Sequence, residues 1–350
     1  MARNSRNCFD NATAPEQSGA NRKENEMKLI AGRNNLAVTL FVPWDCGNNC
    51  PFCTTKQEYK DQSNFSLINQ IITLLKIWCV DDVKDVVITG GEPLANIDGL
   101  KELLTAIYSM ATLKKKKIYI NTSMHDLDGR DAESYLQFFT QFKDVIKGVN
   151  VSEHISFNLA KGNGILLDIL HLCKIPVKLN CVLTGKERYN DLFEFVYKWQ
   201  KQVDTISFRK DYRAVRTDDE LRAEDATLLM LKDIWGDYTS GGCEVCNDDV
   251  FKGGKVHYHR GKESTLIDEK TCLIVNDIIV KQDGSLYLDW GNQHPINPLD
   301  LISQWQKKIR CSLNISDLIA PPVSICESSS FCGYRTGSCG YRTGGCGGGC

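Results

Sequence analysis

Three cysteines with short gaps between them stand in the stretch DCGNNCPFC: Cys46, Cys50 and Cys53. The glycine, asparagine and proline residues around them indicate a loop, and a loop with these gaps can turn three thiolates toward one point. Thiolates are the usual ligands of iron–sulfur clusters, and three of them leave one iron of a [4Fe–4S] cluster without a protein ligand. A structural zinc site would need a fourth protein ligand. The spacing therefore favours a cluster with one open iron.

A second motif, TGGEP, ends the apolar stretch DVVITGG, which the sequence predicts to be a strand. Its consecutive glycines, Gly90 and Gly91, let a ligand approach the backbone closely. The carboxylate of Glu92 beside them can accept hydrogen bonds from an ammonium group. The motif therefore predicts a binding site one strand–helix unit after the cysteines.

The two motifs together resemble the radical S-adenosylmethionine (SAM) superfamily, over roughly residues 35–215. The resemblance implies that the three cysteines hold a [4Fe–4S] cluster, whose open iron binds the amino and carboxylate groups of SAM. It implies that Gly90 to Glu92 line the methionine part of SAM, and Phe52 matches an aromatic residue that the family has before its third cysteine. The implied reaction is reductive cleavage of SAM to methionine and a 5′-deoxyadenosyl radical, which abstracts a hydrogen atom from the substrate.

Polar residues at the ends of later strands extend the implied SAM site. The resemblance places Asn121 and Ser123 near the ribose and carboxylate of SAM, Ser152 at a serine common after the next strand, and Asn180 near the adenosine. Capping of a strand or helix is the alternative role for each. Five further residues are candidates for binding an anionic substrate or the SAM carboxylate, with surface salt bridges as the alternative for the arginines: Glu153, His154, Arg209, Arg213 and Arg216.

The order of apolar segments predicts the fold. Between residue 35 and about 236, six apolar strands alternate with six helices, which is typical of a parallel sheet with right-handed crossovers. Six units indicate an α/β fold with a partial, TIM-like (β/α)6 barrel, whose functional residues gather at the carboxyl ends of the strands. In the first helix, one apolar stripe is expected to be the buried face: Leu67, Ile68, Ile71, Ile72, Leu75 and Trp78.

The pattern becomes β-rich after residue 240, with Asp283-Gly284 as an expected hairpin turn and a helix expected in PLDLISQWQKKI. This region resembles, loosely, the auxiliary-cluster (SPASM or twitch) domains of radical SAM enzymes. SPASM-type relatives, however, have a cluster cysteine where this chain has Asp289 and Trp290. We expect four regions: a disordered leader (1–34), a radical SAM partial barrel (35–238), a small β-rich appendage (239–325) and a flexible Cys/Gly-rich tail (326–350).

The chain has sixteen cysteines and no apolar leader typical of a signal peptide, so we expect metal or redox use in a reducing compartment rather than disulfides. Cys79, Cys173 and Cys181 lie in apolar runs and are expected to pack in the core. The candidate ligands of an auxiliary cluster are Cys243, Cys246 and Cys272. A zinc site with His257 or His259, and inert thiols, are the alternatives.

The tail, CGYRTGSCGYRTGGCGGGC, contains two near copies of a seven-residue unit, and its glycines predict an extended, mobile segment. The sequence leaves four roles open. The tail supplies thiolates to an auxiliary cluster, forms a lid whose Arg335 and Arg342 meet an anionic substrate, is a segment that is modified or mimics the substrate, or has no role.

The net charge of −2 argues against nucleic acid as a partner, and the absence of an 18-residue apolar stretch argues against a membrane span. The resemblance, the β-rich region after residue 240 and the cysteine usage lead us to expect a cytoplasmic, iron-dependent radical SAM oxidoreductase acting on a ribosomally made peptide or protein, with flavodoxin or ferredoxin as electron donor. Its cofactors would be the [4Fe–4S] cluster, SAM and a possible second cluster. One alternative is an enzyme of nucleotide or cofactor biosynthesis, as in the first step of molybdopterin synthesis. Another is an Fe–S redox protein that does not turn over SAM.

Overall fold

The computed structural model describes fifteen stretches of the chain: residues 28–31, 36–48, 50–53, 64–77, 83–109, 117–123, 132–157, 163–211, 218–241, 248–251, 253–259, 265–268, 272–275, 277–288 and 295–301. None of the helices in these stretches is both long and apolar enough to cross a membrane. The expected tail lies outside the described residues, and so does the expected leader except for Lys28–Ala31, which form a strand instead of the disorder that the sequence predicts.

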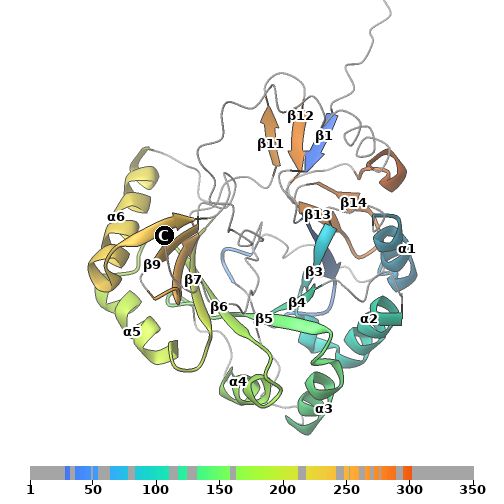
Figure 1. Ribbon diagram of the computed structural model, residues 1–350, viewed down its shortest axis with the longest axis horizontal. Coiled ribbons are helices and arrows are strands. Elements are labelled where there is room, and N and C mark those ends of the chain that lie inside the picture. The colour runs from blue at the N-terminus through green and yellow to red at the C-terminus, as the bar shows by residue number, and fades with distance from the viewer. Residues whose placement is uncertain are drawn as a thin grey trace, which may run out of the picture.

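Within the described stretches, eleven strands form one curved sheet, in the order β14-β13-β2-β3-β4-β5-β6-β7-β10-β9-β8. Its centre consists of six parallel strands: β2 (Leu36–Val42), β3 (Val83–Gly90), β4 (Lys117–Thr122), β5 (Ile146–Ser152), β6 (Val177–Leu183) and β7 (Thr205–Lys210). The edge strands β14 and β8 do not pair with each other, so the barrel is open (Figure 1). The predicted α/β fold with a partial barrel is confirmed.

Helices cover the outer side of this sheet (Figure 1). All six predicted helices are present: α1 (Leu67–Ile77), α2 (Ile97–Ser109), α3 (Ala132–Phe142), α4 (Asn163–Leu172), α5 (Tyr189–Trp199) and α6 (Asp218–Trp235). A short 3-10 helix, η1 (Pro93–Ala95), follows the TGGEP motif. Because each parallel crossover passes over the same face, the helices leave the inner face of the sheet free for other groups.

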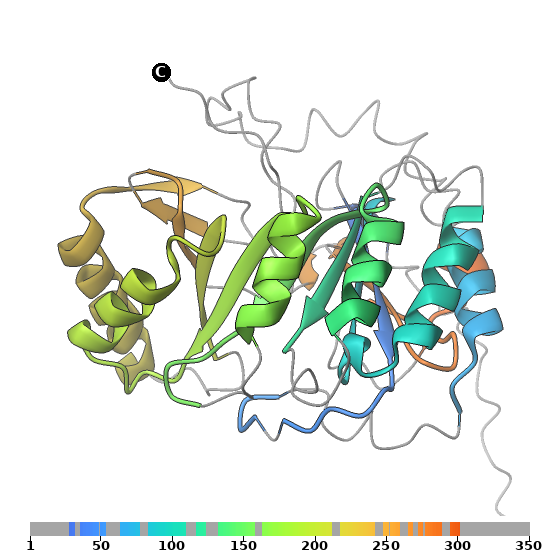
Figure 2. The same ribbon diagram turned by 90° about the horizontal axis from the view of Figure 1, so that it is seen from below.

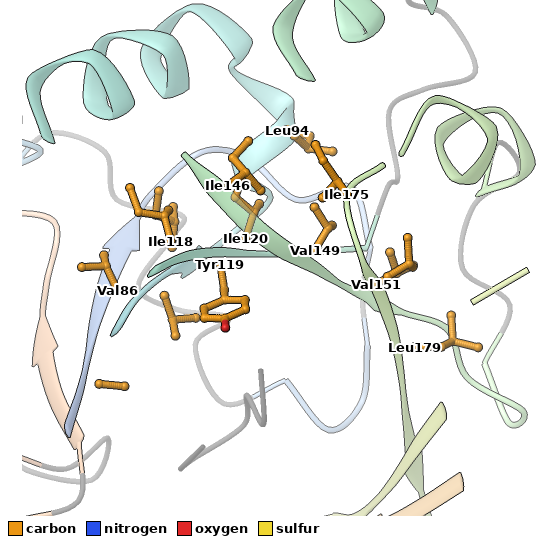
Figure 3. Packing of buried hydrophobic residues seen from close by; sticks show 14 of the residues in the cluster. Val86, Leu94, Ile118, Tyr119, Ile120, Ile146, Val149, Val151, Ile175 and Leu179 are labelled. Atoms are coloured by element: carbon orange, nitrogen blue, oxygen red, sulfur yellow. The ribbon is translucent and has the colours of Figure 1, made fainter. Parts of the chain in front are cut away.

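The core lies between the sheet and the helices. In Figure 3, Ile118 and Ile120 of β4 lie on the side of the sheet that faces the helices, and Tyr119 lies on the opposite side. Val149 and Val151 of β5 are also fully buried in this core. Side chains alternate along a strand, so Asn150 and Ser152 are directed to the inner side. Burial of each such apolar side chain contributes about 1.5–3 kcal/mol to stability, which fixes the face that every strand presents inward.

Strands from the β-rich region extend both edges of the main sheet. On one edge lie β8 (Tyr238–Gly241), β9 (Asp248–Phe251) and β10 (Val256–His259), with β10 parallel to β7. On the other lie β13 (Asp277–Val280), parallel to β2, and β14 (Leu286–Tyr287). A separate three-stranded sheet is formed by β1 (Lys28–Ala31), β12 (Cys272–Val275) and β11 (Thr265–Asp268). The β-rich region is thus joined to the barrel through strand pairing.

The turn between β13 and β14 confirms the predicted hairpin. Lys281 N–H donates to the carbonyl of Ser285 at 2.9 Å, and Gly284 has a φ of 87°. That backbone angle favours glycine. Of the helix expected after this hairpin, residues 298–301 are helical and the rest lies outside the described residues.

The buried face of α1 is not the one that the sequence predicts. Ile68, Ile72 and Leu75 of the apolar stripe are exposed, Ile68 at 72%. Leu67 and Ile71 are partly buried against the core, and Trp78 lies outside the described residues. The buried residues are instead Gln70, Thr73, Leu74 and Ile77. Two polar side chains therefore occupy positions that apolar periodicity assigns to solvent.

The physical reason is a set of backbone carbonyls that need donors. Gln70 Nε2 donates to the carbonyls of Phe41 (2.6 Å) and Lys281 (3.1 Å), and Thr73 Oγ1 donates to that of Gly284 (2.7 Å). Buried carbonyls without a partner are costly, so the helix turns its polar residues inward. Through these bonds α1 holds the C-terminal hairpin to β2, across 211 positions of sequence.

Replacing Gln70 with Met keeps the side-chain volume and removes both donors. We expect the free energy of unfolding to fall by about 2–4 kcal/mol, because two buried carbonyls lose a partner. Urea denaturation followed by circular dichroism measures this. The matched control is Gln137→Met on the exposed face of α3, where the change should stay within about 0.5 kcal/mol. Equal stability of the two variants would mean that the hairpin does not depend on Gln70.

Candidate functional site

The cysteine loop follows β2 and lies along the edge where the parallel strands end, in blue in Figure 2. Cys46, Cys50 and Cys53 are free thiols, each partly buried. Cys53 N–H donates to the carbonyl of Cys50 at 3.2 Å, which closes a tight turn between these two residues. The loop therefore presents three thiols at the end of the barrel where function gathers in such folds.

The donor set, three thiols in one loop, has the chemistry that iron–sulfur clusters use. Within the described stretches, no three His, Cys, Asp or Glu side chains form a group that could hold one metal ion. Burial raises the pKa of the Cys46 thiol to about 11, with the charge of Glu92 adding to the effect. Cys46 must therefore lose its proton when it becomes a metal ligand.

Glu92 accepts four hydrogen bonds beside this loop, and only 1% of it is exposed. One carboxylate oxygen accepts from Leu94 N–H (3.0 Å) and Thr122 Oγ1 (2.5 Å). The other accepts from the backbone N–H of Ser123 (2.7 Å) and from its hydroxyl (2.6 Å). The carboxylate thus ties the end of β3 to the end of β4. Its predicted role at the methionine part of SAM stays a prediction.

Ser123 carries this network on to the cysteine loop. Asn48 Nδ2 donates to Ser123 Oγ at 2.8 Å, and Cys46 Sγ lies 4.0 Å from the same oxygen. Asn48 is buried although it belongs to a loop. The ends of β3 and β4 and the loop after β2 are therefore one hydrogen-bonded unit, in which Glu92 and Ser123 position the first cysteine.

Position 90 must be glycine because the backbone of β2 lies too close to leave room for a side chain. Its φ is 140°, and a Cβ built on it would lie 1.9 Å from the carbonyl oxygen of Val42. Gly91 N–H donates to that same oxygen at 3.0 Å, and Glu92 N–H donates to the carbonyl of Trp44 at 3.0 Å. Gly90 thus lets the segment after β3 run against the start of the cysteine loop.

The predicted residues of later strands share the inner face of the sheet. Asn121 on β4 lies beside Asn150 on β5, and Asn150 Nδ2 donates to Asn121 Oδ1 at 2.7 Å. Ser152 pairs in register with Asn180 on β6, and Asn180 with Ser207 on β7. The structure therefore brings the predicted SAM residues into one polar row, and their roles stay predictions.

His154 connects the cysteine loop to β5 and β6. Its ring packs edge-on against Phe52, with 4.5 Å between the centroids, and its Nδ1 accepts from Val182 N–H at 3.0 Å. Burial lowers the pKa of His154 from 6.5 to about 4, although the charge of Glu187 acts in the opposite direction. The imidazole is therefore neutral near pH 7, and the predicted role of His154 in binding an anion stays a prediction.

Arg209 is buried, with 2% exposure, so the alternative of a surface salt bridge is wrong for this residue. Sequence reasoning also missed Asn150 and Ser207, which are completely buried in β5 and β7. The signal that could have found these two residues is a polar residue at an inward position of an otherwise apolar strand. Sequence reasoning missed Glu187 as well. Burial alone would raise the pKa of that carboxyl, but hydrogen bonds from Ser156 and Thr184 lower it overall.

Several predicted residues cannot be placed. Outside the described residues lie Arg213, Arg216, Cys79, Cys243, Cys246, Asp289, Trp290 and the tail. Cys272 begins β12, but its side chain is not described. The auxiliary cluster therefore stays a prediction. Cys173 and Cys181 are buried, which confirms the two of them as core residues.

The structure defines an α/β protein with an open parallel barrel and a three-thiol loop at the carboxyl ends of its strands. Residues 45–152 match the family model of the radical SAM superfamily. The chain therefore carries a radical SAM domain, and this domain contains the cysteine loop, the TGGEP motif and Ser123.

Two curated relatives are GTP 3′,8-cyclases. That of Haemophilus influenzae is 25% identical over 159 residues, which are 40% of this chain and 47% of the relative. That of Campylobacter lari is 28% identical over 194 residues, which are 51% and 56%. The chain thus spans about half the length of the curated relatives it matches. A similar solved structure is Streptococcus suis SuiB bound to S-adenosylmethionine, with 15% identity, coverage of 77% of this chain and 65% of SuiB, and a TM-score of 0.49.

The Glu92→Gln variant tests whether the hydrogen bonds of this carboxylate stabilise the fold. Gln offers one acceptor oxygen and places an NH2 group against donors, so we expect the free energy of unfolding to fall by about 2–4 kcal/mol. Urea denaturation gives the value. Glu133→Gln on the exposed start of α3 is the control and should change stability by less than about 0.5 kcal/mol. A Glu92→Gln variant as stable as this control would show that the network contributes little.

The buried imidazole of His154 predicts a pH dependence of stability. The pKa is about 4 in the folded chain and 6.5 unfolded, so the unfolded state binds more protons between these values. The contribution of neutral His154 to the free energy of unfolding is therefore fully present above pH 6.5 and is lost toward pH 4, by about 3 kcal/mol in all. His154→Gln, which keeps an acceptor for Val182 N–H, should flatten this slope in urea unfolding between pH 7 and 4.5. The exposed His171→Gln should not. Identical slopes for both variants would exclude His154 as the source.

Proposed function

We propose that this chain is a radical SAM enzyme, which cleaves SAM reductively and abstracts a hydrogen atom from a substrate. The observation that carries the proposal is the hydrogen-bonded unit that joins the cysteine loop to Glu92 and Ser123 inside a radical SAM domain. A protein that only carries an iron–sulfur cluster has no need for a second set of positioned polar groups at the same strand ends.

In this proposal, Cys46, Cys50 and Cys53 hold the [4Fe–4S] cluster, which when bound supplies the electron that splits a carbon–sulfur bond of SAM. The chain itself binds and orients. Glu92 and Ser123 fix the first cysteine through the contacts described above. The inner polar row of Asn121, Ser152 and Asn180 lines the path of SAM away from the cluster. Phe52 and the neutral His154 form an apolar contact that helps to exclude water.

The substrate class has two candidates. A ribosomally made peptide or protein is supported by the β-rich C-terminal region and by the cysteine usage. A nucleotide or cofactor precursor, as in molybdopterin synthesis, is supported by the similarity to GTP 3′,8-cyclases. Both candidates need an electron donor such as flavodoxin or ferredoxin, and a second cluster on Cys243, Cys246 and Cys272 is compatible with either of them. Either reaction places the enzyme in a reducing, cytoplasmic setting.

Incubation of the reduced, cluster-loaded protein with SAM tests the activity. We expect 5′-deoxyadenosine and methionine in equal amounts, measured by liquid chromatography and mass spectrometry. Cys50→Ala should lose cluster iron and reduce 5′-deoxyadenosine to background, because one ligand of the cluster is gone. The control Cys173→Ala removes a buried core thiol and should retain both. Intact cluster without any 5′-deoxyadenosine would refute the proposal.

The same assay separates the substrate classes. Candidate substrates labelled with deuterium, GTP in one arm and precursor peptides in the other, transfer deuterium to 5′-deoxyadenosine only when they are the source of the abstracted hydrogen atom.

A further inference from the structure

The side chain of Arg209 is directed toward the inside of the barrel. Its neighbour Phe208 packs against Phe195 of α5 (5.8 Å between centroids) and Trp235 of α6 (6.3 Å), which fixes that residue on the helix side of β7. Side chains alternate along a strand, so Ser207 and Arg209 face the inner side of the sheet. Arg209 thus belongs to the same face as the polar row of β4 to β6.

Its guanidinium group is buried without a partner. Only 2% of Arg209 is exposed, and its Nε, Nη1 and Nη2 atoms make no hydrogen bond within the described structure. It belongs to none of the ion pairs found among the described residues. An arginine keeps its charge in proteins, and an unpaired buried charge is strongly destabilising. Such an arrangement needs a compensating group, and none comes from the described chain.

Two neighbouring polar atoms are unsatisfied as well. Ser207 Oγ and Asn180 Oδ1 are buried and make no hydrogen bond within the described structure. The two residues lie side by side in register on β7 and β6, and Arg209 is two positions beyond Ser207. A hydroxyl and a fork of N–H donors beside an amide oxygen form a site that complements an oxyanion carrying a neighbouring hydroxyl or N–H group.

The anion held here would not be the carboxylate of SAM. The groups implied to bind the methionine part of SAM lie at the ends of β3 and β4, whereas Arg209 lies on β7, three strands away from β4. At about 4.8 Å per strand this is about 14 Å along the sheet. The amino and carboxylate groups of methionine share one carbon atom, so one SAM molecule cannot place its amino group at β3 and its carboxylate at Arg209. The anion belongs to a second ligand.

We propose that Arg209 together with Ser207 forms the anion-binding end of the substrate site, next to Asn180 at the end of the row that lines SAM, and that the substrate carries a phosphate or a carboxylate. The proposal rests on the proposed function, because that function supplies the need for a second ligand beside SAM. Phosphate and carboxylate share the planar, bidentate recognition that the guanidinium fork provides. A nucleotide would supply the first and an acidic peptide the second.

The test uses the cluster-loaded protein, with inorganic pyrophosphate and succinate as probes of the two anions. We expect one of them to raise the melting temperature in a saturable manner, and its identity gives the substrate class. Arg209→Met should weaken this response about 10- to 100-fold, as expected for the loss of a charge-assisted hydrogen-bonding pair. The exposed Lys201→Gln should keep the response of the wild type. If neither anion changes the melting temperature, or if Arg209→Met responds like wild type, the proposal is wrong.

The melting temperature without any added anion provides a second, independent readout. A buried arginine without a partner destabilises the ligand-free protein, so Arg209→Met should melt at a higher temperature than wild type. Arg209→Lys, which retains the charge, should not. An arginine with a purely structural role would give the opposite order, and a lower melting temperature for Arg209→Met would overturn the proposal. A failure of the proposed function can be told apart from a failure of the anion site. If pyrophosphate or succinate binds through Arg209 but SAM is not cleaved, the enzyme activity is refuted and the anion site is retained.

Discussion

The buried carboxylate of Glu92 is the constraint on which the candidate site depends. Four N–H and O–H donors surround it, supplied by η1, by the end of β4 and by Ser123. A carboxylate without hydrogen bonds at such a depth would be too costly to bury, so its donors must stay where they are. Ser123 is one of these donors and also contacts the cysteine loop. The loop therefore takes its position from β3 and β4, although it follows β2 in the chain.

The open barrel explains why such a network is found at one end of the sheet. Each strand buries its apolar residues against the helices, which leaves the alternate positions for the inner face. Toward the carboxyl ends these positions are polar on four adjacent strands: Asn121, Asn150, Ser152, Asn180, Ser207 and Arg209. The apolar packing on one face thus determines, residue by residue, which polar groups meet on the other. Fold stability and site geometry are two consequences of the same alternation.

The sequence was sufficient for the features that depend on local pattern. Six strand–helix units, the loop character of the cysteine motif and the turn at Gly284 all follow from periodicity or from the preferences of single residues. The buried face of α1 does not follow from local pattern. Gln70 and Thr73 face inward because they donate to carbonyls of the hairpin, more than 200 positions further along the chain, and a short stretch of sequence does not contain that information. The same limit applies to Asn48, whose burial depends on Ser123, 75 positions further along the chain.

The two ends of the polar row suggest where the reacting hydrogen atom would lie. SAM would be held at β3 and β4, and the substrate anion at β7. The strands between them, β5 and β6, present Asn150 and Asn180, each with a buried amide oxygen that has no partner within the described structure. Unsatisfied acceptors cost stability, and proteins tolerate them at binding sites, where a ligand supplies the missing donor. A substrate that reaches from Arg209 toward SAM would pass both oxygens and could donate to each. The position of its hydrogen atom would then be set by the spacing of the strands, since each contact comes from a different strand of one rigid sheet.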